Sequence, residues 1–129
     1  MTEGLGQPIR VMLVEDHVPF RRAMATLLSR QPDLEVVAQA GSLEEARRNA
    51  PSVSIDVAVL DLGLPDGNGV DVVEDLRQVG SGTAVMILSN NLDPTTFERA
   101  TEAGADEFLT KFATPGEILG AIRRIGARE

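Results

Sequence analysis

The chain has no cysteine, few aromatic residues and no long apolar run near its start. Without cysteine, disulfide bonds and thiolate-ligated metal sites are excluded. A reducing compartment is the usual setting for such a chain, so we expect a cytoplasmic protein. The first apolar run, residues 11–14, is far too short for a signal peptide or a membrane span. We therefore expect no association with a membrane.

Basic residues are also in the minority. The chain has 12 Lys and Arg against 20 Asp and Glu, a net charge of −8, which opposes attraction to nucleic acid or anionic lipid. We expect no direct nucleic-acid binding by this segment. A length of 129 residues suits one domain with its own core. We expect that domain over residues 9–129, after a flexible N-terminal segment, residues 1–8.

Short apolar runs alternate with amphipathic helical patterns along the chain. The apolar runs predict five strands, at residues 9–14, 34–40, 55–60, 83–89 and 106–110. Each run is followed by a helical pattern. The apolar stripe of the first helix comprises Phe20, Ala23, Met24, Leu27 and Leu28, and that of the third comprises Val72, Val73, Leu76 and Val79. The fourth helix has a thin apolar stripe, mainly Phe97, Ala100 and Ala103.

Helix boundaries carry their own signals. Three pairs have the spacing of N-terminal capping or first-turn residues: Ser42 with Glu45, Asp93 with Pro94, and Thr114 with Glu117. Gly104 favours the end of the fourth helix. The pattern predicts five strands and five helices in strict alternation.

This alternation, with continuously apolar strands, indicates an α/β fold with a parallel sheet covered by helices on both faces. For one domain of this size we expect a flavodoxin-like (βα)5 three-layer sandwich. Its five parallel strands would have the order 2-1-3-4-5, and its ligand crevice would lie at the carboxyl ends of strands 1 and 3.

Acidic residues follow both of these crevice strands. In "AVLDLGLPDGNG" Asp61 comes directly after strand 3, and Glu15 and Asp16 come directly after strand 1. Three carboxylates close together need a compensating cation, and hard oxygen ligands suit Mg²⁺ or Mn²⁺. The alternative is that each acid only caps a helix or turn. Because the acids follow both strands at once, we favour a divalent metal site.

Two further polar groups occur at the ends of the last two strands. Ser89 ends strand 4 and Lys111 follows strand 5. Taken alone, Ser89 could be a cap and Lys111 a solvated surface residue. Together with the acids they match the groups needed for phosphoryl transfer to a carboxylate. A carboxylate that accepts a phosphoryl group needs a metal ion, a lysine and hydrogen-bond donors around the transferred oxygens.

Four motifs carry a family resemblance that covers the chain from Ile9 to about Ile125. They are "VEDH", "LDLGLPDGNG", "ILSN" and "EAGADEFLTK". With them the sequence resembles the CheY-like receiver domain of two-component response regulators. "IRVMLVEDH", the paired arginines Arg21 and Arg22, and "PDLEVVAQA" resemble the NarL/FixJ subgroup, whose members carry a LuxR-type helix-turn-helix.

The resemblance implies a role for each site residue. It makes Asp61 the phosphoacceptor and Asp16 the direct Mg²⁺ ligand, with Glu15 acting through a water molecule and the Gly63 backbone carbonyl as a further ligand. Lys111 would pair with the phosphoryl oxygens. The switch residues would be Ser89 and Phe108: Ser89 would move toward the phosphoryl group and Phe108 would turn inward behind it.

The resemblance also implies partners. A sensor histidine kinase would donate the phosphoryl group and dock on the first helix, where Arg21, Arg22 and Arg30 could supply charge. Homodimerisation on phosphorylation and control of transcription through a DNA-binding domain absent from this chain would follow. The domain would be a switch and no enzyme, apart from self-catalysed phosphorylation and autodephosphorylation.

Three features depart from the family pattern. Phe112 follows Lys111 where many members have a proline in a cis bond. Either the loop tolerates the strain of a cis Lys111–Phe112 bond or it is built differently, and we expect strain. Asn90 and Asn91 follow the hydroxyl where a small residue is usual, and Gly63 presents no side chain. We expect Gly63, Asn90 and Asn91 to modulate the lifetime of the phosphoryl group.

Other function classes fit less well. A haloacid-dehalogenase-type phosphatase needs a second aspartate two residues after the nucleophile, where Gly63 stands. A Toprim-type nuclease needs an Asp-x-Asp pair, and none follows strand 3. The serious alternative is a receiver fold used as a phosphorylation-independent interaction module, which would lack site residues that are present here.

Overall fold

The fold was determined as a computed structural model that describes residues 7–49, 54–64, 67–68, 73–74, 82–90 and 94–126. Most of the expected N-terminal segment, residues 1–8, lies outside this set. So does most of the expected third helix, of which only Val73 and Glu74 are described, in helical conformation. Asp93, the expected cap of the fourth helix, lies outside it as well.

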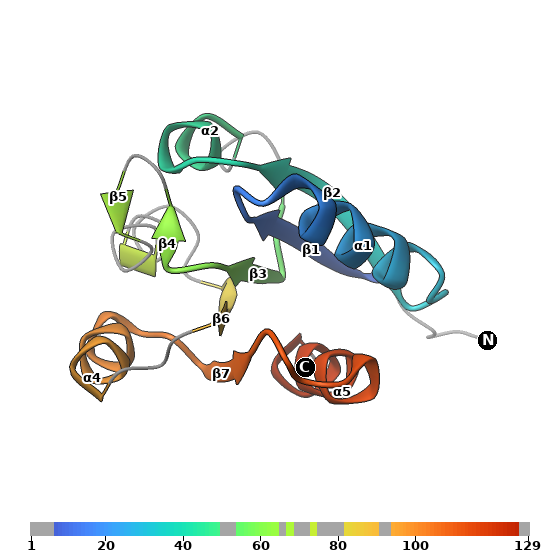
Figure 1. The fold of residues 1–129 in the computed structure, drawn as a ribbon. Helices are drawn as coiled ribbons and strands as arrows, with labels where there is room; N and C mark the ends of the chain where they lie inside the picture. Colours follow the sequence, from blue (N-terminus) through green and yellow to red (C-terminus); the bar gives the residue numbers. More distant parts are fainter. Residues whose placement is uncertain are drawn as a thin grey trace.

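Five parallel strands form the central sheet (Figure 1). They are β1 (Ile9–Val14), β2 (Leu34–Ala40), β3 (Val57–Leu60), β6 (Ala84–Ser89) and β7 (Glu107–Thr110). Their order across the sheet is β2-β1-β3-β6-β7, which confirms the expected order 2-1-3-4-5. The loop after β3 adds a small antiparallel pair that the sequence pattern did not predict, β4 (Gly63–Leu64) with β5 (Gly67–Asn68).

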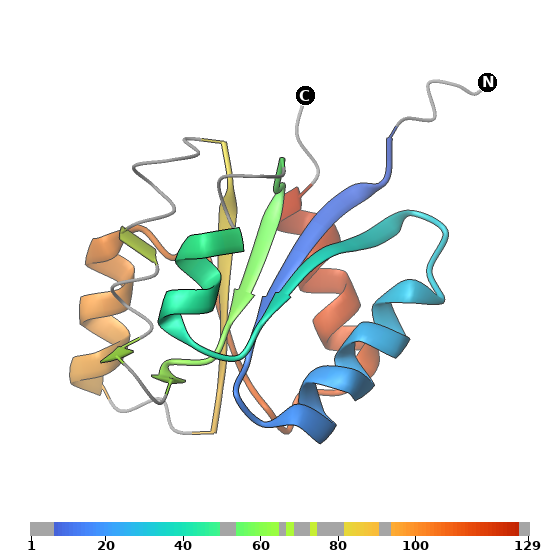
Figure 2. The same ribbon diagram turned by 90° about the horizontal axis from the view of Figure 1, so that it is seen from above.

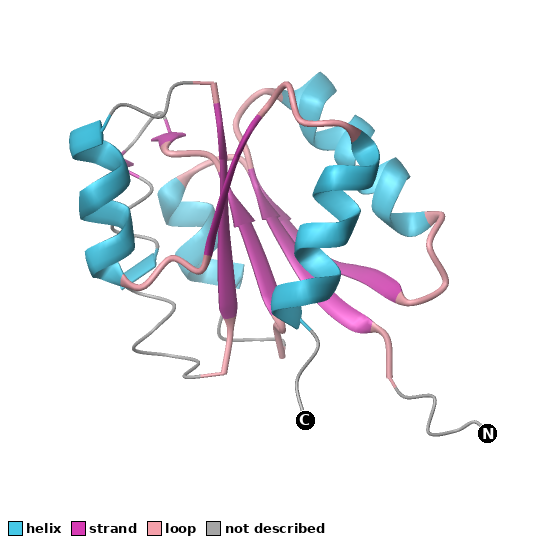
Figure 3. Cartoon of the chain, turned by 90° about the horizontal axis from the view of Figure 1, so that it is seen from below, coloured by secondary structure: helices cyan, strands magenta, loops and turns pink. Residues whose placement is uncertain are grey.

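Helices cover both faces of the sheet. They are α1 (Val18–Ser29), α2 (Leu43–Asn49), α4 (Pro94–Ala103) and α5 (Pro115–Gly126). Figures 2 and 3 show α1 and α5 on one face and α2 and α4 on the other. None of the helices in the described part of the chain is long and apolar enough to cross a membrane.

The expected helix boundaries are confirmed where they are described. Thr114 and Glu117 form a reciprocal capping box at α5: the Thr114 N–H donates to Glu117 Oε1 at 2.8 Å, and the Glu117 N–H donates to Thr114 Oγ1 at 3.1 Å. At α2 the Glu45 N–H donates to Ser42 Oγ at 3.1 Å. Gly104, with a φ of 112°, ends α4 in the left-handed region that glycine adopts without strain.

Alternate residues of the strands fill two apolar cores. In β1, Val11 and Leu13 pack toward α1 and α5, whereas Met12 and Val14 pack toward α2 and α4. One expectation for α1 was wrong: Ala23 is exposed, and Ala25 packs against the core in its place. Ala is small enough to sit at either edge of a helical stripe, so periodicity alone does not decide its side.

Candidate functional site

Three of the expected site residues extend the sheet ladder by one step beyond the strand ends. The Glu15 N–H donates to the Ala40 carbonyl at 2.9 Å, and the Asp61 N–H donates to the Val14 carbonyl at 2.9 Å. The Lys111 N–H donates to the Ser89 carbonyl at 3.1 Å. These bonds hold the three residues at the carboxyl edge of one sheet, as the topology predicts.

The three acids converge at this edge. Glu15, Asp16 and Asp61 each place a carboxylate oxygen within 4.8 Å of the others. Glu15 is 6% exposed and Asp61 is 9% exposed, whereas Asp16 lies open to solvent. Consecutive residues of a strand point to opposite faces. Glu15 and Asp16 can both face Asp61 because the chain leaves β1 at Val14 and bends.

Lys111 compensates the two buried acids. Its Nζ lies 2.7 Å from Glu15 Oε1 and 3.4 Å from Asp61 Oδ2, and its side chain is only 11% exposed. Burial by itself would lower the pKa of Lys111. The hydrogen bond to Glu15 and the charge of Asp61 together outweigh that effect and raise the pKa above its ordinary value. Lys111 is therefore a cation at neutral pH.

In both buried carboxylates one oxygen accepts a backbone N–H and the other faces the Lys111 ammonium. Glu15 Oε2 accepts the His17 N–H at 3.0 Å, and Asp61 Oδ1 accepts the Gly63 N–H at 3.2 Å. The other oxygen of each carboxylate faces Lys111. Both acids are thus oriented by the backbone on one side and by the ammonium on the other. The three carboxylates of the cluster are hard oxygen ligands, so this donor set fits Mg²⁺ or Mn²⁺.

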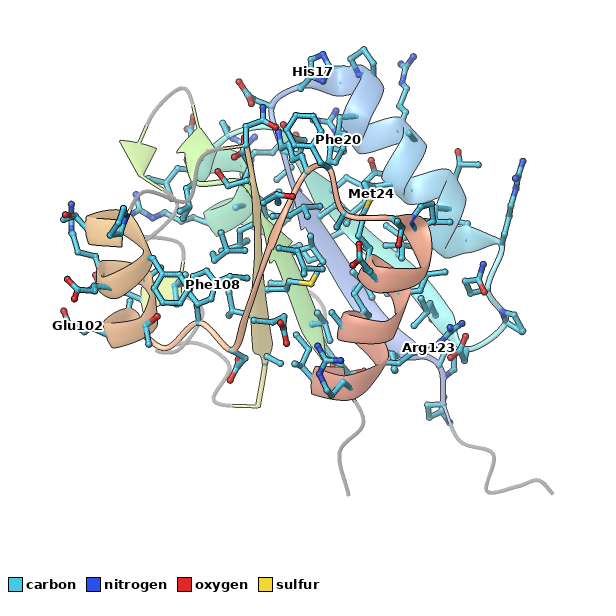
Figure 4. The ribbon with its side chains drawn as sticks, turned by 60° about the horizontal axis from the view of Figure 1, so that its bottom comes forward. His17, Phe20, Met24, Glu102, Phe108 and Arg123 are labelled. Atoms are coloured by element: carbon cyan, nitrogen blue, oxygen red, sulfur yellow. The ribbon has the colours of Figure 1, made fainter. Side chains whose placement is uncertain are left out.

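The remaining expected site residues lie around this centre. Ser89 is buried at the end of β6, and Asn90 after it is exposed; Asn91 lies outside the described residues. A Cβ built on Gly63 would meet no atom of the described residues within 4 Å. The half-buried Phe108 on β7 packs against Phe97 of α4, with ring centroids 4.4 Å apart. Figure 4 shows Phe108 directed toward α4.

The strain expected at the Lys111–Phe112 bond is not found. No described peptide bond is cis, so this bond is trans. The loop is instead a tight turn, in which the Ala113 N–H donates to the Thr110 carbonyl and the Phe112 N–H donates to Thr110 Oγ1. The ladder bond of Lys111 to Ser89 aims the lysine without a cis bond. The Phe112 side chain is 86% exposed.

Two residues of α1 belong to the site although the sequence pattern gave them other roles. The Phe20 ring, expected as plain core, lies 4.8 Å from Lys111 Nζ in a cation–π contact. Arg21, expected to offer charge for docking, is half-buried and donates from Nη1 to the Glu15 carbonyl at 2.7 Å. Both line a small cavity together with Glu15 and Asp61 (Figure 4 labels Phe20). Their position about one helical turn after the acids, together with the Arg21–Arg22 pair, was the available sequence signal.

A family model matches most of the chain. Residues 11–123 match the model of the response regulator receiver domain. The chain belongs to that family. The receiver domain is 37% identical over 119 residues to the DNA-binding transcriptional activator DevR/DosR of Mycobacterium tuberculosis. That match covers 92% of this chain and 55% of the relative.

Further relatives place the receiver domain in the NarL/LuxR-type group. It is 37% identical over 117 residues to the transcriptional regulatory protein UhpA of Salmonella typhimurium. This match covers 91% of this chain and 58% of the relative. It is similar to the crystal structure of a LuxR-family two-component response regulator from Aurantimonas. The TM-score is 0.86 at 32% identity, over 93% of this chain and 86% of that one. The receiver domain thus spans little more than half the length of the curated relatives it matches.

The family membership confirms the expected resemblance and fold. The chain is a receiver domain of NarL/LuxR-type two-component response regulators, and its relatives are regulators, not classical enzymes. Receiver domains interact with histidine kinases and can dimerise. They typically bind Mg²⁺ at an acidic pocket, which here corresponds to the cluster of Glu15, Asp16 and Asp61.

Proposed function

We propose that Asp61 accepts a phosphoryl group from the phosphohistidine of a sensor histidine kinase. One observation carries the proposal: Asp61 is a buried carboxylate, nearly closed off from water, with an ammonium at 3.4 Å and two further acids beside it. A fold gains no stability from such a concentration of like charge, whereas phosphoryl transfer to a carboxylate needs it to hold a cation.

In this reaction an Asp61 carboxylate oxygen bonds to phosphorus as the phosphorus–nitrogen bond of phosphohistidine breaks. The imidazole nitrogen leaves with the electron pair. Lys111, already charged and buried, supplies one positive group for the phosphoryl oxygens. The Gly63 N–H keeps the Asp61 side chain oriented through Oδ1.

A divalent cation would complete the charge balance. Asp16 and Asp61 would hold Mg²⁺ or Mn²⁺ directly, with Glu15 acting through water and the Gly63 carbonyl as a further ligand. The bound ion would neutralise the phosphoryl oxygens during transfer. Asp16 is the exposed member of the acidic cluster, which suits an ion that keeps several waters.

The output would be a change of the surface formed by α4, β7 and α5. Phosphorylation adds roughly one to two negative charges at the site, which Ser89 would meet by moving toward the phosphoryl group. Phe108 would turn inward behind it; its contact with Phe97, which is 42% exposed on α4, supports this role. Gly63, Asn90 and Asn91 would set the lifetime of the phosphoryl state. Dimerisation and transcription control through a DNA-binding domain outside this chain would be the result.

The proposal is tested by intact-mass measurement after addition of MgCl₂ and a small phosphodonor such as acetyl phosphate. We expect a labile adduct of one phosphoryl group on the wild-type chain and on Glu102→Gln, which removes an exposed acid of α4 (Figure 4). Asp61→Asn should gain none. A wild-type chain that never gains the adduct, or an Asp61→Asn variant that gains it equally, contradicts the proposal and favours a phosphorylation-independent module.

The metal assignment needs a separate measurement. Calorimetric titration with MgCl₂ should show weaker binding to Asp16→Ala than to wild type, and unchanged binding to Glu102→Gln. Equal affinity of Asp16→Ala and wild type would exclude Asp16 as a ligand.

A further inference from the structure

Arg21 is held between the ends of two neighbouring strands. It lies in the first turns of α1, yet its side chain turns back toward the sheet, and Nη1 donates to the Glu15 carbonyl at 2.7 Å. Its Nε is fully buried and makes no hydrogen bond with the described part of the chain. An exposed docking arginine would not bury a donor in this way, because burial without a partner costs free energy.

The space for the guanidinium exists because residue 41 is glycine. Gly41 follows β2, and a Cβ built on it would lie 2.9 Å from Arg21 Nη1 and 3.8 Å from the Glu15 carbonyl oxygen. A contact of 2.9 Å forces one group to move. The end of a flexible arginine moves more easily than backbone, so a side chain at position 41 would push the guanidinium out of its present position.

The backbone of Glu15 is therefore held on both sides. Its N–H donates to the Ala40 carbonyl of β2, and its carbonyl accepts from Arg21. The Glu15 carbonyl belongs to the peptide unit that joins Glu15 to Asp16. The orientation of this peptide unit decides whether the carboxylates of Glu15 and Asp16 can both face Asp61. In the structure each of the three carboxylates places an oxygen within 4.8 Å of the others.

We propose that Arg21 is a positioning residue of the acidic site, which fixes the Glu15–Asp16 peptide so that both carboxylates face Asp61, and that Gly41 is required to leave room for it. This inference rests on the proposed Mg²⁺ site. Groups that orient metal ligands typically contribute 10- to 100-fold to metal affinity.

The sign of the effect separates positioning from simple charge. Arg21 is a cation near three acids, so its charge alone opposes Mg²⁺, and its removal would tighten binding. Positioning predicts the opposite, namely weaker binding when Arg21 is removed. A role confined to kinase docking leaves only this charge effect and predicts Mg²⁺ binding equal to or tighter than that of wild type.

Calorimetric titration with MgCl₂ provides the test. We expect Arg21→Gln to weaken Mg²⁺ binding about tenfold or more. Arg22→Gln is the matched control, because it removes the same charge from the next, exposed position of α1, and its affinity should equal or slightly exceed that of wild type. Arg21→Lys keeps a charged donor and should recover part of the loss. Circular dichroism of the metal-free variants checks that they are folded.

Gly41→Ala tests the same contact from its other side without a change of charge. It should weaken Mg²⁺ binding in the wild-type background and add little to Arg21→Gln, because the group it displaces is then gone. Equal losses in both backgrounds would show that Gly41 acts independently of Arg21 and would overturn that part of the proposal.

A readout without metal completes the test. In the metal-free protein, hydrogen exchange at the Glu15 amide should speed up in Arg21→Gln and Gly41→Ala, while the Leu13 amide inside β1 should be unchanged. If wild type binds Mg²⁺ and both variants bind it as tightly, with the same Glu15 exchange rate, the inference is wrong and the proposed function stands. If wild type binds no Mg²⁺, the proposed metal site fails, and the exchange rates alone decide the role of Arg21.

Discussion

Lys111 shows how one residue balances the site. It is the only lysine of the chain, and its ammonium contacts both buried acids. In the metal-free protein it offsets the negative charge of the two buried acids at the sheet edge, where uncompensated burial of charge would cost free energy. The same ammonium competes with a divalent cation for Glu15 and Asp61. Its effects on metal binding and on phosphoryl binding should therefore have opposite signs.

Lys111→Met separates these two effects. We expect Mg²⁺ affinity to rise a few-fold, because a competing cation is removed from the acidic cluster. We expect the phosphoryl adduct from acetyl phosphate to accumulate far more slowly, because a positive group for its oxygens is lost. Lys111→Arg keeps the charge and should show a smaller change of both. Calorimetry and intact-mass time courses measure the two quantities; a fall in Mg²⁺ affinity for Lys111→Met would contradict the competition.

Helix α5 is specified at both ends. Its first turn has the reciprocal capping box of Thr114 and Glu117. Its last residue, Gly126, lies against β1 and β3: a Cβ there would come within 2.9 Å of Ile9 Cγ2 and within 2.9 Å of Val57 Cγ2. Val57 is fully buried, so these methyl groups have little room to move. The glycine allows the end of α5 to approach the sheet.

Two alanine substitutions in α5 should change stability in opposite directions. Gly126→Ala should destabilise the domain by about 1–3 kcal/mol, because the new methyl group overpacks the core. A Cβ on Gly120 meets nothing within 4 Å. Gly120→Ala should therefore stabilise the domain by about 0.5–1 kcal/mol through helix propensity. Urea unfolding followed by circular dichroism measures both. A neutral Gly126→Ala would show that the sheet and helix can separate there without cost.

At the scale of the whole molecule, a bidentate ion pair joins segments 90 residues apart. Arg123 of α5, labelled in Figure 4, donates from Nε to Asp33 Oδ2 at 2.8 Å and from Nη2 to Asp33 Oδ1 at 3.0 Å. Its Nη2 also donates to Gln31 Oε1 at 3.1 Å. The hydrogen bond from Arg123 lowers the pKa of Asp33 below its ordinary value. This contact connects the last helix to the loop that precedes β2.

Because the pKa of Asp33 is lowered, the contribution of this ion pair to folding stability depends on pH. The unfolded chain binds a proton at Asp33 near pH 4, before the folded chain does, so the contribution of this pair is complete above that pH and is lost as the pH falls. We expect wild type to lose more stability between pH 5 and pH 3 than Arg123→Gln does. Arg124→Gln, which removes the neighbouring ion pair to Glu107, is the control. Parallel pH profiles of wild type and Arg123→Gln would contradict the assignment.

Periodicity was reliable for strands and less so for side chains on helices. The strands lie where their apolar runs predict, because continuous burial on both faces of a parallel sheet leaves a strong pattern. The side of Ala23 was predicted wrongly, and the short β4–β5 pair was not predicted, since two-residue ladders leave no pattern. The expected strain after Lys111 was not found, because the Lys111–Phe112 bond is trans.

The sequence by itself determined which chemical groups stand at the strand ends. Glu15, Asp61, Ser89 and Lys111 each end or directly follow an apolar run, and parallel strands bring their carboxyl ends to one edge. Only the tertiary structure decided how these groups are oriented. Arg21 reaches back to Glu15, Phe20 packs on Lys111, and Gly41 leaves the necessary space. Such contacts depend on the distance between a helix and a strand, which no spacing along the chain encodes.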